Sequence, residues 1–169
     1  MSIAIVVGNP KPRSRTFHAA QLVAEQLTGR KPDLAIDLVD FGPALLDWKD
    51  ERVAQAVANV QAAQLLVVAS PTFKATYTGL LKLFLDRFAA GSLAKVLAIP
   101  LMLGGDWRHS LAPEVFLKPV LSELGAMCPT RGLFLLDSEY AESETLQVWL
   151  ATARSQLPAA VLGPAGFAP

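Results

Sequence analysis

The segment 8–17 gathers the side chains best suited to hold a small anion. Basic and hydroxyl residues follow one another there as Lys11, Arg13, Ser14, Arg15 and Thr16, and a helix-periodic apolar stretch comes next. The N-terminus of a helix presents unpaired N–H groups and partial positive charge, and a guanidinium group can hold two phosphate oxygens. These residues predict binding of a terminal phosphate.

Residue identity excludes two familiar phosphate loops at this segment. It lacks the Gly-x-x-x-x-Gly-Lys-Ser/Thr pattern of a P-loop. No second or third glycine follows Gly8 at the spacing that lets a pyrophosphate approach the backbone. A monophosphate is therefore the better match. The alternative is a basic surface loop, stiffened by proline, before an ordinary helix cap.

A second candidate segment, 70–79, combines hydroxyl groups, two aromatic rings and a lysine. Phe73 and Tyr77 can pack on the face of a flat ring, while backbone N–H groups and hydroxyls bind its polar edge. The alternative, in which both rings simply join the hydrophobic core, agrees equally well with the sequence.

A third candidate segment contains Gly104 and Gly105, followed by Asp106. Two glycines allow a ligand to approach the backbone closely, or allow positive φ in a turn. His109 invites a catalytic interpretation, because an imidazole group can serve as a general acid or base. Because no Ser/His/Asp or Cys/His set is evident around it, the favoured interpretation is a surface or subunit-contact histidine.

Five short apolar runs alternate with five amphipathic stretches along the chain. The runs predict strands buried on both faces of a parallel sheet, at 3–7, 34–39, 65–69, 96–101 and 133–136. The stretches predict helices at 16–27, 51–63, 78–90, 110–126 and 143–157, the fourth broken or bent by prolines. Thr16 is the predicted cap of the first helix and Gly29 its end. The alternation predicts a three-layer α/β sandwich, whose ligands bind beyond the carboxyl ends of the strands.

Composition limits the class of protein. Of 169 residues, 52% are apolar and 18% charged, and the net charge is zero. This balance excludes a disordered chain and disfavours a general binder of nucleic acid or membrane surfaces. No apolar run approaches the ~18 residues that a membrane span needs. We expect one domain over 1–160 and a flexible tail at 161–169.

Cys128 is the only cysteine, which excludes an intramolecular disulfide and a cysteine metal cluster. Placed late in a predicted helix, it is expected to be a small core residue rather than a nucleophile. The N-terminus lacks the pattern of a secretory signal. Together these features predict a cytoplasmic protein.

Taken together, the three segments resemble the NADPH-dependent FMN reductase family, and within it the reductases of two-component sulfonate monooxygenase systems. The resemblance spans roughly residues 3–136 and rests on Gly8-Asn9-Pro10 with Ser14-Arg15-Thr16, on 70–79 with Leu81-Lys82 and Asp86, and on Gly104-Gly105 with His109 and 117–121. It implies a flavodoxin-like fold, with a five-stranded parallel sheet of order 2-1-3-4-5 and helices on both faces.

The resemblance also implies which residues bind FMN. The residues that would bind the phosphate are Asn9, Lys11, Ser14, Arg15 and Thr16, to which the basic loop adds Arg13. Those that would bind the ribityl chain and the ring are Pro71, Thr72, Phe73, Lys74 and Thr76. The polar edge of the flavin would lie against Gly104 and Gly105, with Asp106 beside them. Asn9 replaces the family's usual serine, Lys11 a common arginine and Phe73 a tyrosine. No metal and no catalytic side chain are predicted, because the flavin carries the hydride transfer.

One departure from the sulfonate-linked reductases lies in the fourth predicted helix. Those relatives have an inserted tyrosine shortly before the Leu-Lys-Pro-Val-Leu stretch, where this chain has Val115 followed by Phe116. In the family that tyrosine is tied to tetramer packing and loose flavin exchange. Its absence leaves both properties open for this chain.

The resemblance implies an NAD(P)H-dependent FMN reductase, which passes a hydride from nicotinamide C4 to flavin N5 and then releases reduced FMN or passes electrons on. An FMN-retaining reductase of quinones, azo dyes or metal ions stays an alternative. A flavodoxin-type electron carrier is disfavoured by the zero net charge and the basic loop. NADPH and NADH both stay open, with Lys11, Arg13, Arg15 or Lys74 as candidates for a 2′-phosphate.

The same resemblance implies partners. They are the small molecules flavin, nicotinamide nucleotide and quinone, and a flavin-dependent monooxygenase. The family's flavin lies at a subunit interface, so a homodimer or homotetramer is implied. Trp48, Trp107 and Trp149 agree with such a contact, although tryptophans also fill cores.

Overall fold

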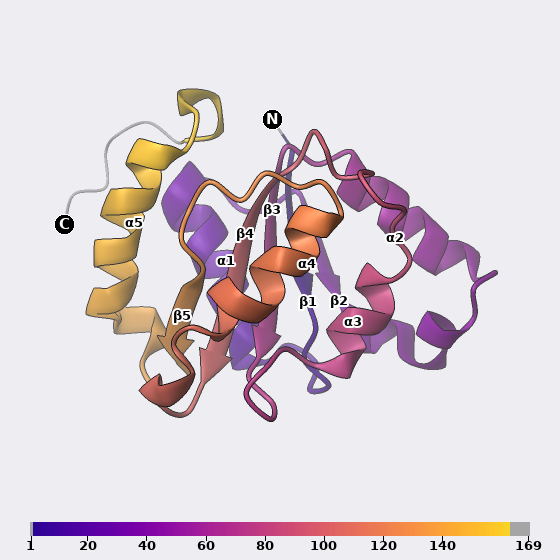
Figure 1. The fold of residues 1–169 in the computed structure, drawn as a ribbon, viewed down its shortest axis with the longest axis horizontal. Coiled ribbons are helices and arrows are strands. Elements are labelled where there is room, and N and C mark those ends of the chain that lie inside the picture. The colour runs from indigo at the N-terminus through magenta and orange to yellow at the C-terminus, as the bar shows by residue number, and fades with distance from the viewer. Residues whose placement is uncertain (1, 163–169) are drawn as a thin grey trace.

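The computed structural model describes residues 2–162. One parallel sheet of five strands, in the order β2-β1-β3-β4-β5, forms its centre (Figure 1). The strands are β1 (Ile3–Val7), β2 (Leu34–Asp37), β3 (Leu65–Pro71), β4 (Leu97–Gly104) and β5 (Leu133–Leu136). Every neighbouring pair runs parallel. The flavodoxin-like strand order and the parallel sheet are confirmed.

Helices cover both faces of this sheet, which makes three layers (Figure 1). One face carries α1 (Arg15–Thr28) and α5 (Glu144–Gln156), and the other carries α2 (Glu51–Gln61), α3 (Gly79–Leu85) and α4 (Lys118–Glu123). Successive strand residues point to opposite faces, so β1 sends Ile5 into one core and Val6 into the other. Burial on both faces explains why the predicted strands read as continuous apolar runs.

Three strands differ from their predicted bounds, and β3 differs only at its end, which is Pro71 rather than residue 69. The edge strand β2 stops at Asp37, where the 3₁₀ segment η1 (Leu38–Leu46) begins, and its residue Ala35 is exposed. The interior strand β4 runs three residues further than predicted, to Gly104, because β3 and β5 both pair with its end. Pairing with neighbours, which a local pattern does not record, decides these ends.

Capping groups determine where α1 begins and ends. The side chain of Ser14, rather than Thr16 as predicted, caps the helix by accepting the N–H of Phe17. Thr16 already lies in the first turn. Gly29 ends the helix with φ at 70°, as predicted, because glycine adopts the left-handed conformation without strain.

The predicted fourth helix is divided in two. A π-helical turn, η3 (Pro113–Leu117), precedes α4, and the N–H of Lys118 reaches back five residues to the carbonyl of Pro113. Val115 and Phe116 are both exposed on this turn. The bend that the prolines predicted therefore takes the form of a π-turn.

The end of the chain and its surface complete the fold. Val161 closes a short 3₁₀ turn, η5 (Ala159–Val161), and is buried beside α5, whereas 163–169 of the predicted tail lie outside the described residues. Within 2–162, no helix combines the length and apolar character needed to cross a membrane.

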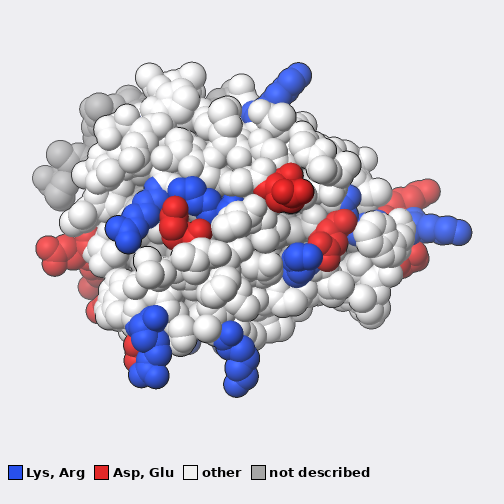
Figure 2. Space-filling view, in the orientation of Figure 1, with Lys and Arg blue, Asp and Glu red and all other residues white. Residues whose placement is uncertain are grey.

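Figure 2 shows the face that bears α3 and α4. Most of this face is uncharged, and several of its charged side chains lie next to one of opposite sign.

Candidate functional site

The loops after β1, β3 and β4 meet at the lower edge of the sheet in Figure 1 and surround a cavity of ≈ 340 Å³. The residues lining it are Asn9, Lys11, Arg13, Ser14, Arg15, Thr16, His18, Pro71, Thr72, Phe73, Leu103, Gly104, Gly105 and Asp137. Eleven of the fourteen predicted site residues are among them, and Lys74, Thr76 and Asp106 are not. Carboxyl ends of parallel strands share one edge, which is why distant segments meet here.

Buried hydroxyl groups stand at the N-terminus of α1. Ser14 is 4% exposed and Thr16 is 2% exposed. The amide of Asn9 donates to Thr16 Oγ1 at 3.0 Å, while Asn9 Oδ1 accepts the N–H of Lys11 at 2.9 Å. Each hydroxyl here accepts a hydrogen bond from the protein, which leaves its own proton free to donate to a ligand.

Arg13 is engaged with carboxylates behind the loop. Its guanidinium pairs with Asp37 at 2.8 Å and with Asp40 at 2.7 Å, and it stacks over the ring of Phe17 at 5.2 Å from the centroid. The hydrogen bonds that Arg13 donates to Asp40 and Asp37 raise the pKa of its guanidinium group. Arg13, which was predicted to bind the phosphate, thus lines the cavity, but neighbouring carboxylates balance its positive charge.

Arg15 is paired as well, across the mouth of the cavity. It contacts the Asp137 carboxylate at 3.1 Å and donates to the Asp137 carbonyl at 3.1 Å. Asp137 was not among the predicted site residues. The rule that identified the other loops also points to it, because Asp137 directly follows β5 at the same sheet edge.

A tight turn carries the aromatic side of the cavity. Phe73 and Thr76 exchange two backbone hydrogen bonds, of 2.9 and 3.3 Å, around Lys74 and Ala75. Both central residues have positive φ, 51° and 68°, as a two-residue hairpin turn requires. Phe73 lines the cavity and is 51% exposed, so it does not join the core. Lys74 and Thr76 lie in the turn beyond the cavity lining.

The end of β4 forms the opposite side. A Cβ atom at Gly104 would lie 2.8 Å from Phe134 Cζ and 3.3 Å from Thr72 Oγ1, so no side chain fits there. Thr72 Oγ1 itself is buried and has no hydrogen-bond partner among the described residues. Gly105 faces open space. Gly104 and Gly105 both line the cavity, so the backbone borders it directly at this strand end.

The residues after Gly105 turn away from the cavity lining. Asp106 caps a short 3₁₀ turn, η2 (Trp107–His109), and its hydrogen bonds with Arg108 lower the pKa of its carboxyl group. His109 ends this turn and is not among the residues lining the cavity. This placement agrees with its interpretation as a residue outside the reaction.

A family model described as NADPH-dependent FMN reductase matches residues 1–141. The chain belongs to this family. The FMN reductase (NADPH) of Escherichia coli strain K12 is 32% identical over 143 residues, which are 82% of this chain and 75% of the relative. The NADH-dependent FMN reductase SfnE of Pseudomonas putida is 30% identical over 167 residues, 93% and 87% of the two chains. A solved apo structure of an NADH:FMN oxidoreductase (EMOB) has a TM-score of 0.83 at 30% identity, covering 99% of this chain and 97% of that one.

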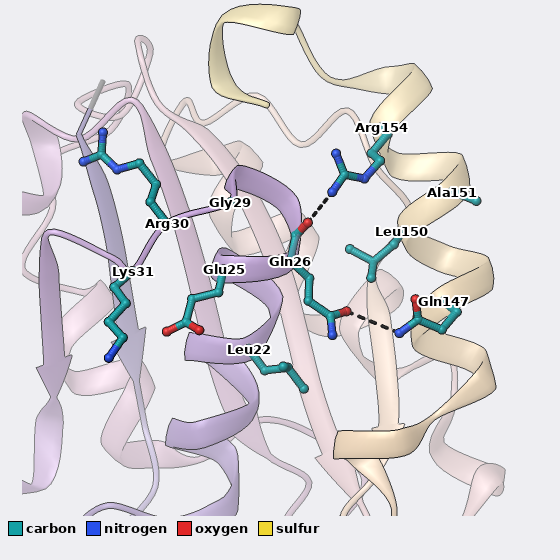
Figure 3. A pocket seen from close by; sticks show the side chains of 10 residues that line it. All are labelled: Leu22, Glu25, Gln26, Gly29, Arg30, Lys31, Gln147, Leu150, Ala151 and Arg154. Atoms are coloured by element: carbon teal, nitrogen blue, oxygen red, sulfur yellow. Dashed lines mark hydrogen bonds between the residues drawn. The ribbon is translucent and has the colours of Figure 1, made fainter. Parts of the chain in front are cut away.

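This member of the NADPH-dependent FMN reductase family has a second, larger cavity of ≈ 990 Å³, an open groove between α1 and α5 (Figure 3). Its polar groups bind one another: Arg154 donates to the carbonyl of Gln26, and Gln147 donates to the Gln26 side chain at 3.4 Å. Gly29, at the end of α1, lies in its lining, so the groove extends away from the loops described above. Size alone therefore does not mark the functional site.

Cys128 lies beyond α4, which ends at Glu123, rather than late in a helix as predicted. It is half-buried and packs against the core that contains α4. Burial raises the pKa of its thiol to about 11. At neutral pH the thiol is protonated, as expected of a packing residue rather than a nucleophile.

Proposed function

We propose that the cavity at the carboxyl edge of the sheet is the site at which this chain binds FMN and reduces it with NAD(P)H. The activity is that of the family, an NAD(P)H-dependent FMN reductase using FMN and a nicotinamide nucleotide. One observation carries the assignment of the site. Buried hydroxyls at a helix N-terminus, an exposed aromatic ring and a bare strand end surround the same cavity.

The residues of the cavity fit a flat ligand with a terminal phosphate. The unpaired hydroxyl of Thr72 is costly while buried, and a polar atom of the ligand would supply its partner. At Gly105, where a Cβ would meet nothing within 4 Å, a ring can approach the backbone closely. At the other end, the hydroxyls of Ser14 and Thr16 and the first N–H groups of α1 suit phosphate oxygens.

The proposed roles of the residues are binding and orientation. FMN, when bound, accepts the hydride that the nicotinamide donates. Ser14, Thr16 and Arg15 hold the phosphate end, and Phe73 covers the flat end and excludes water from it. No side chain is required to move a proton in this step, which agrees with the position of His109 away from the lining.

The choice between NADPH and NADH belongs to side chains at the rim of the cavity. The relatives differ in this respect, since the Escherichia coli protein is named for NADPH and SfnE for NADH. Arg13 and Arg15 are engaged with carboxylates. We assign a 2′-phosphate, where one is bound, to Lys11 or Lys74, both of which are exposed in the two loops.

A single assay tests the proposal. The purified protein is passed over a gel-filtration column, its visible spectrum is recorded, and oxidation of NADPH and NADH is followed with and without added FMN. Turnover that requires added FMN supports release of reduced flavin. A protein that stays yellow and reduces a quinone without free flavin supports an FMN-retaining reductase. Absence of NAD(P)H oxidation under every condition would refute both.

Three further expectations stay predictions. They are a flavin-dependent monooxygenase as the consumer of reduced FMN, a homodimer or homotetramer, and a cytoplasmic location. Co-purification with a monooxygenase, light scattering and cell fractionation test them in turn.

A further inference from the structure

A buried carboxylate lies behind the proposed phosphate loop, at the end of β2. The side chain of Asp37 is 0% exposed, and Asp37 is not among the residues lining the cavity. Its Oδ2 atom accepts two hydrogen bonds from one residue, the backbone N–H and the Nη1 group of Arg13, each at 2.8 Å. Its Oδ1 atom has no partner among the described residues. Burying such a charge is costly, and Arg13 is the residue that offsets the cost.

Asp37 holds Arg13 in an unusual backbone conformation. Arg13 has φ at 48°, the left-handed region that side chains other than glycine, asparagine and aspartate rarely adopt. Such strain persists only where surrounding contacts impose it. The hydrogen bond from the Arg13 N–H to a buried, immobile carboxylate is a contact of this kind.

The conformation of Arg13 matters because Ser14 comes next. Ser14 is the N-cap of α1, so the backbone direction at residue 13 determines how the chain enters the helix. The same geometry determines where the Ser14 hydroxyl and the first free N–H groups of α1 point. A side chain that holds residue 13 therefore holds the anion-binding groups without touching the anion.

We propose that Asp37 is a positioning residue for the FMN phosphate, acting through the backbone and side chain of Arg13. This inference rests on the proposed function, in which α1 receives the phosphate. The charge arrangement supports it. Asp37 and Asp40 together engage the Arg13 guanidinium, so the contribution of Arg13 to the site is the shape of its backbone rather than a free charge.

The test compares FMN with riboflavin, which has the same ring and ribityl chain but no phosphate. Dissociation constants are measured by quenching of flavin fluorescence for the wild type, Asp37→Ala, Asp37→Asn and the matched control Asp40→Asn. Asp40 pairs with the same guanidinium but is half exposed and leaves the Arg13 N–H bond intact. Thermal unfolding of each variant without ligand shows which of them are folded at the assay temperature.

A positioning role predicts a loss confined to FMN. We expect Asp37→Ala to weaken FMN binding by roughly 10- to 100-fold, in line with the loss of hydrogen bonds to a charged group. Riboflavin binding is expected to change less than about twofold. Asp37→Asn keeps one oxygen acceptor for the Arg13 N–H, so it should fall between the wild type and alanine. It decides the question if the alanine variant does not fold. Asp40→Asn should bind both flavins like the wild type.

Three results would overturn the inference, and they are distinguishable. If the wild type binds riboflavin as tightly as FMN, the phosphate site itself is wrong, and the role of Asp37 fails with it. If the wild type prefers FMN and the folded Asp37 variants keep the same preference, only the positioning role is wrong. Equal losses for both flavins would also refute it, since they indicate a general disturbance of the cavity.

Discussion

The substitution Gly104→Ala is expected to destabilise the protein, because the end of β4 has no room for a methyl group. The added Cβ would lie 2.8 Å from Cζ and 3.1 Å from Cε2 of Phe134. Non-bonded carbon atoms prefer separations of roughly 3.5–4.0 Å, so the phenyl ring must move by about 0.5–1 Å. Phe134 is 4% exposed and its ring centroid lies 5.7 Å from that of Trp107, which leaves it little freedom.

The magnitude follows from this overpacking. Forcing extra atoms into a packed region costs about 1–3 kcal/mol. For a protein of this size each kcal/mol lowers Tm by roughly 2–4 °C, so we expect a decrease of about 2–12 °C. Gly105 is a matched control, because an added Cβ there meets nothing within 4 Å. Gly105→Ala should change the free energy of unfolding by less than about 0.5 kcal/mol.

Thermal and urea unfolding, followed by circular dichroism, provide the measurement. Both are done without flavin, because a ligand that binds the folded state would itself raise Tm. Equal Tm values for the two alanine variants would refute the reasoning, since the only difference claimed between the positions is the contact with Phe134. A stable Gly104→Ala protein would mean that β5 moves away from β4 at little cost.

Three further predictions address the site and its surroundings. Arg15→Ala should weaken FMN binding about 10-fold. Asp137→Asn should strengthen FMN binding by about 2- to 5-fold, because this substitution frees Arg15 from an exposed ion pair. If fluorescence quenching shows unchanged FMN affinity in both variants, Arg15 is not part of the phosphate site. Ser14→Ala should lower the free energy of unfolding by about 1 kcal/mol through loss of the α1 cap, as urea titration can show. Burial raises the pKa of the Cys128 thiol from 9.0 to about 11. The rate at which this thiol reacts with iodoacetamide should therefore rise toward pH 11 in the folded protein, but already near pH 9 in the protein unfolded by urea. Because the pKa is raised on folding, the stability that this group contributes is present below pH 9 and is lost as the pH rises toward 11. Identical pH profiles of alkylation in the folded and the unfolded protein would contradict the burial of the thiol.

Much of the candidate site was predictable from residue types and the edge rule for parallel sheets. Strands such as β1 were predicted residue for residue, because apolar runs buried on both faces are visible in sequence. Since carboxyl ends share one edge, the segments around Ser14, Thr72 and Gly104 were expected to meet, and they line one cavity. Lys74 and Thr76 fall outside this lining, because their tight turn projects beyond it.

The partners of the basic residues were not predictable in the same way. Arg13 meets Asp37 across 24 residues and Arg15 meets Asp137 across 122, and no local pattern links either pair. The sequence therefore suggested a loop whose positive charges have no acidic partner. In the structure, packing at the sheet edge places a carboxylate against the guanidinium groups of both Arg13 and Arg15.

The sequence by itself determined the layered fold and the edge of the sheet where the candidate site lies, because hydrophobic periodicity and helix caps are local properties of the chain. Tertiary structure alone decided the charge balance of the proposed phosphate loop, the backbone conformation of Arg13 and the lack of room at Gly104. Each of these depends on distances between strands and helices, which arise only when the two faces of the sheet are packed.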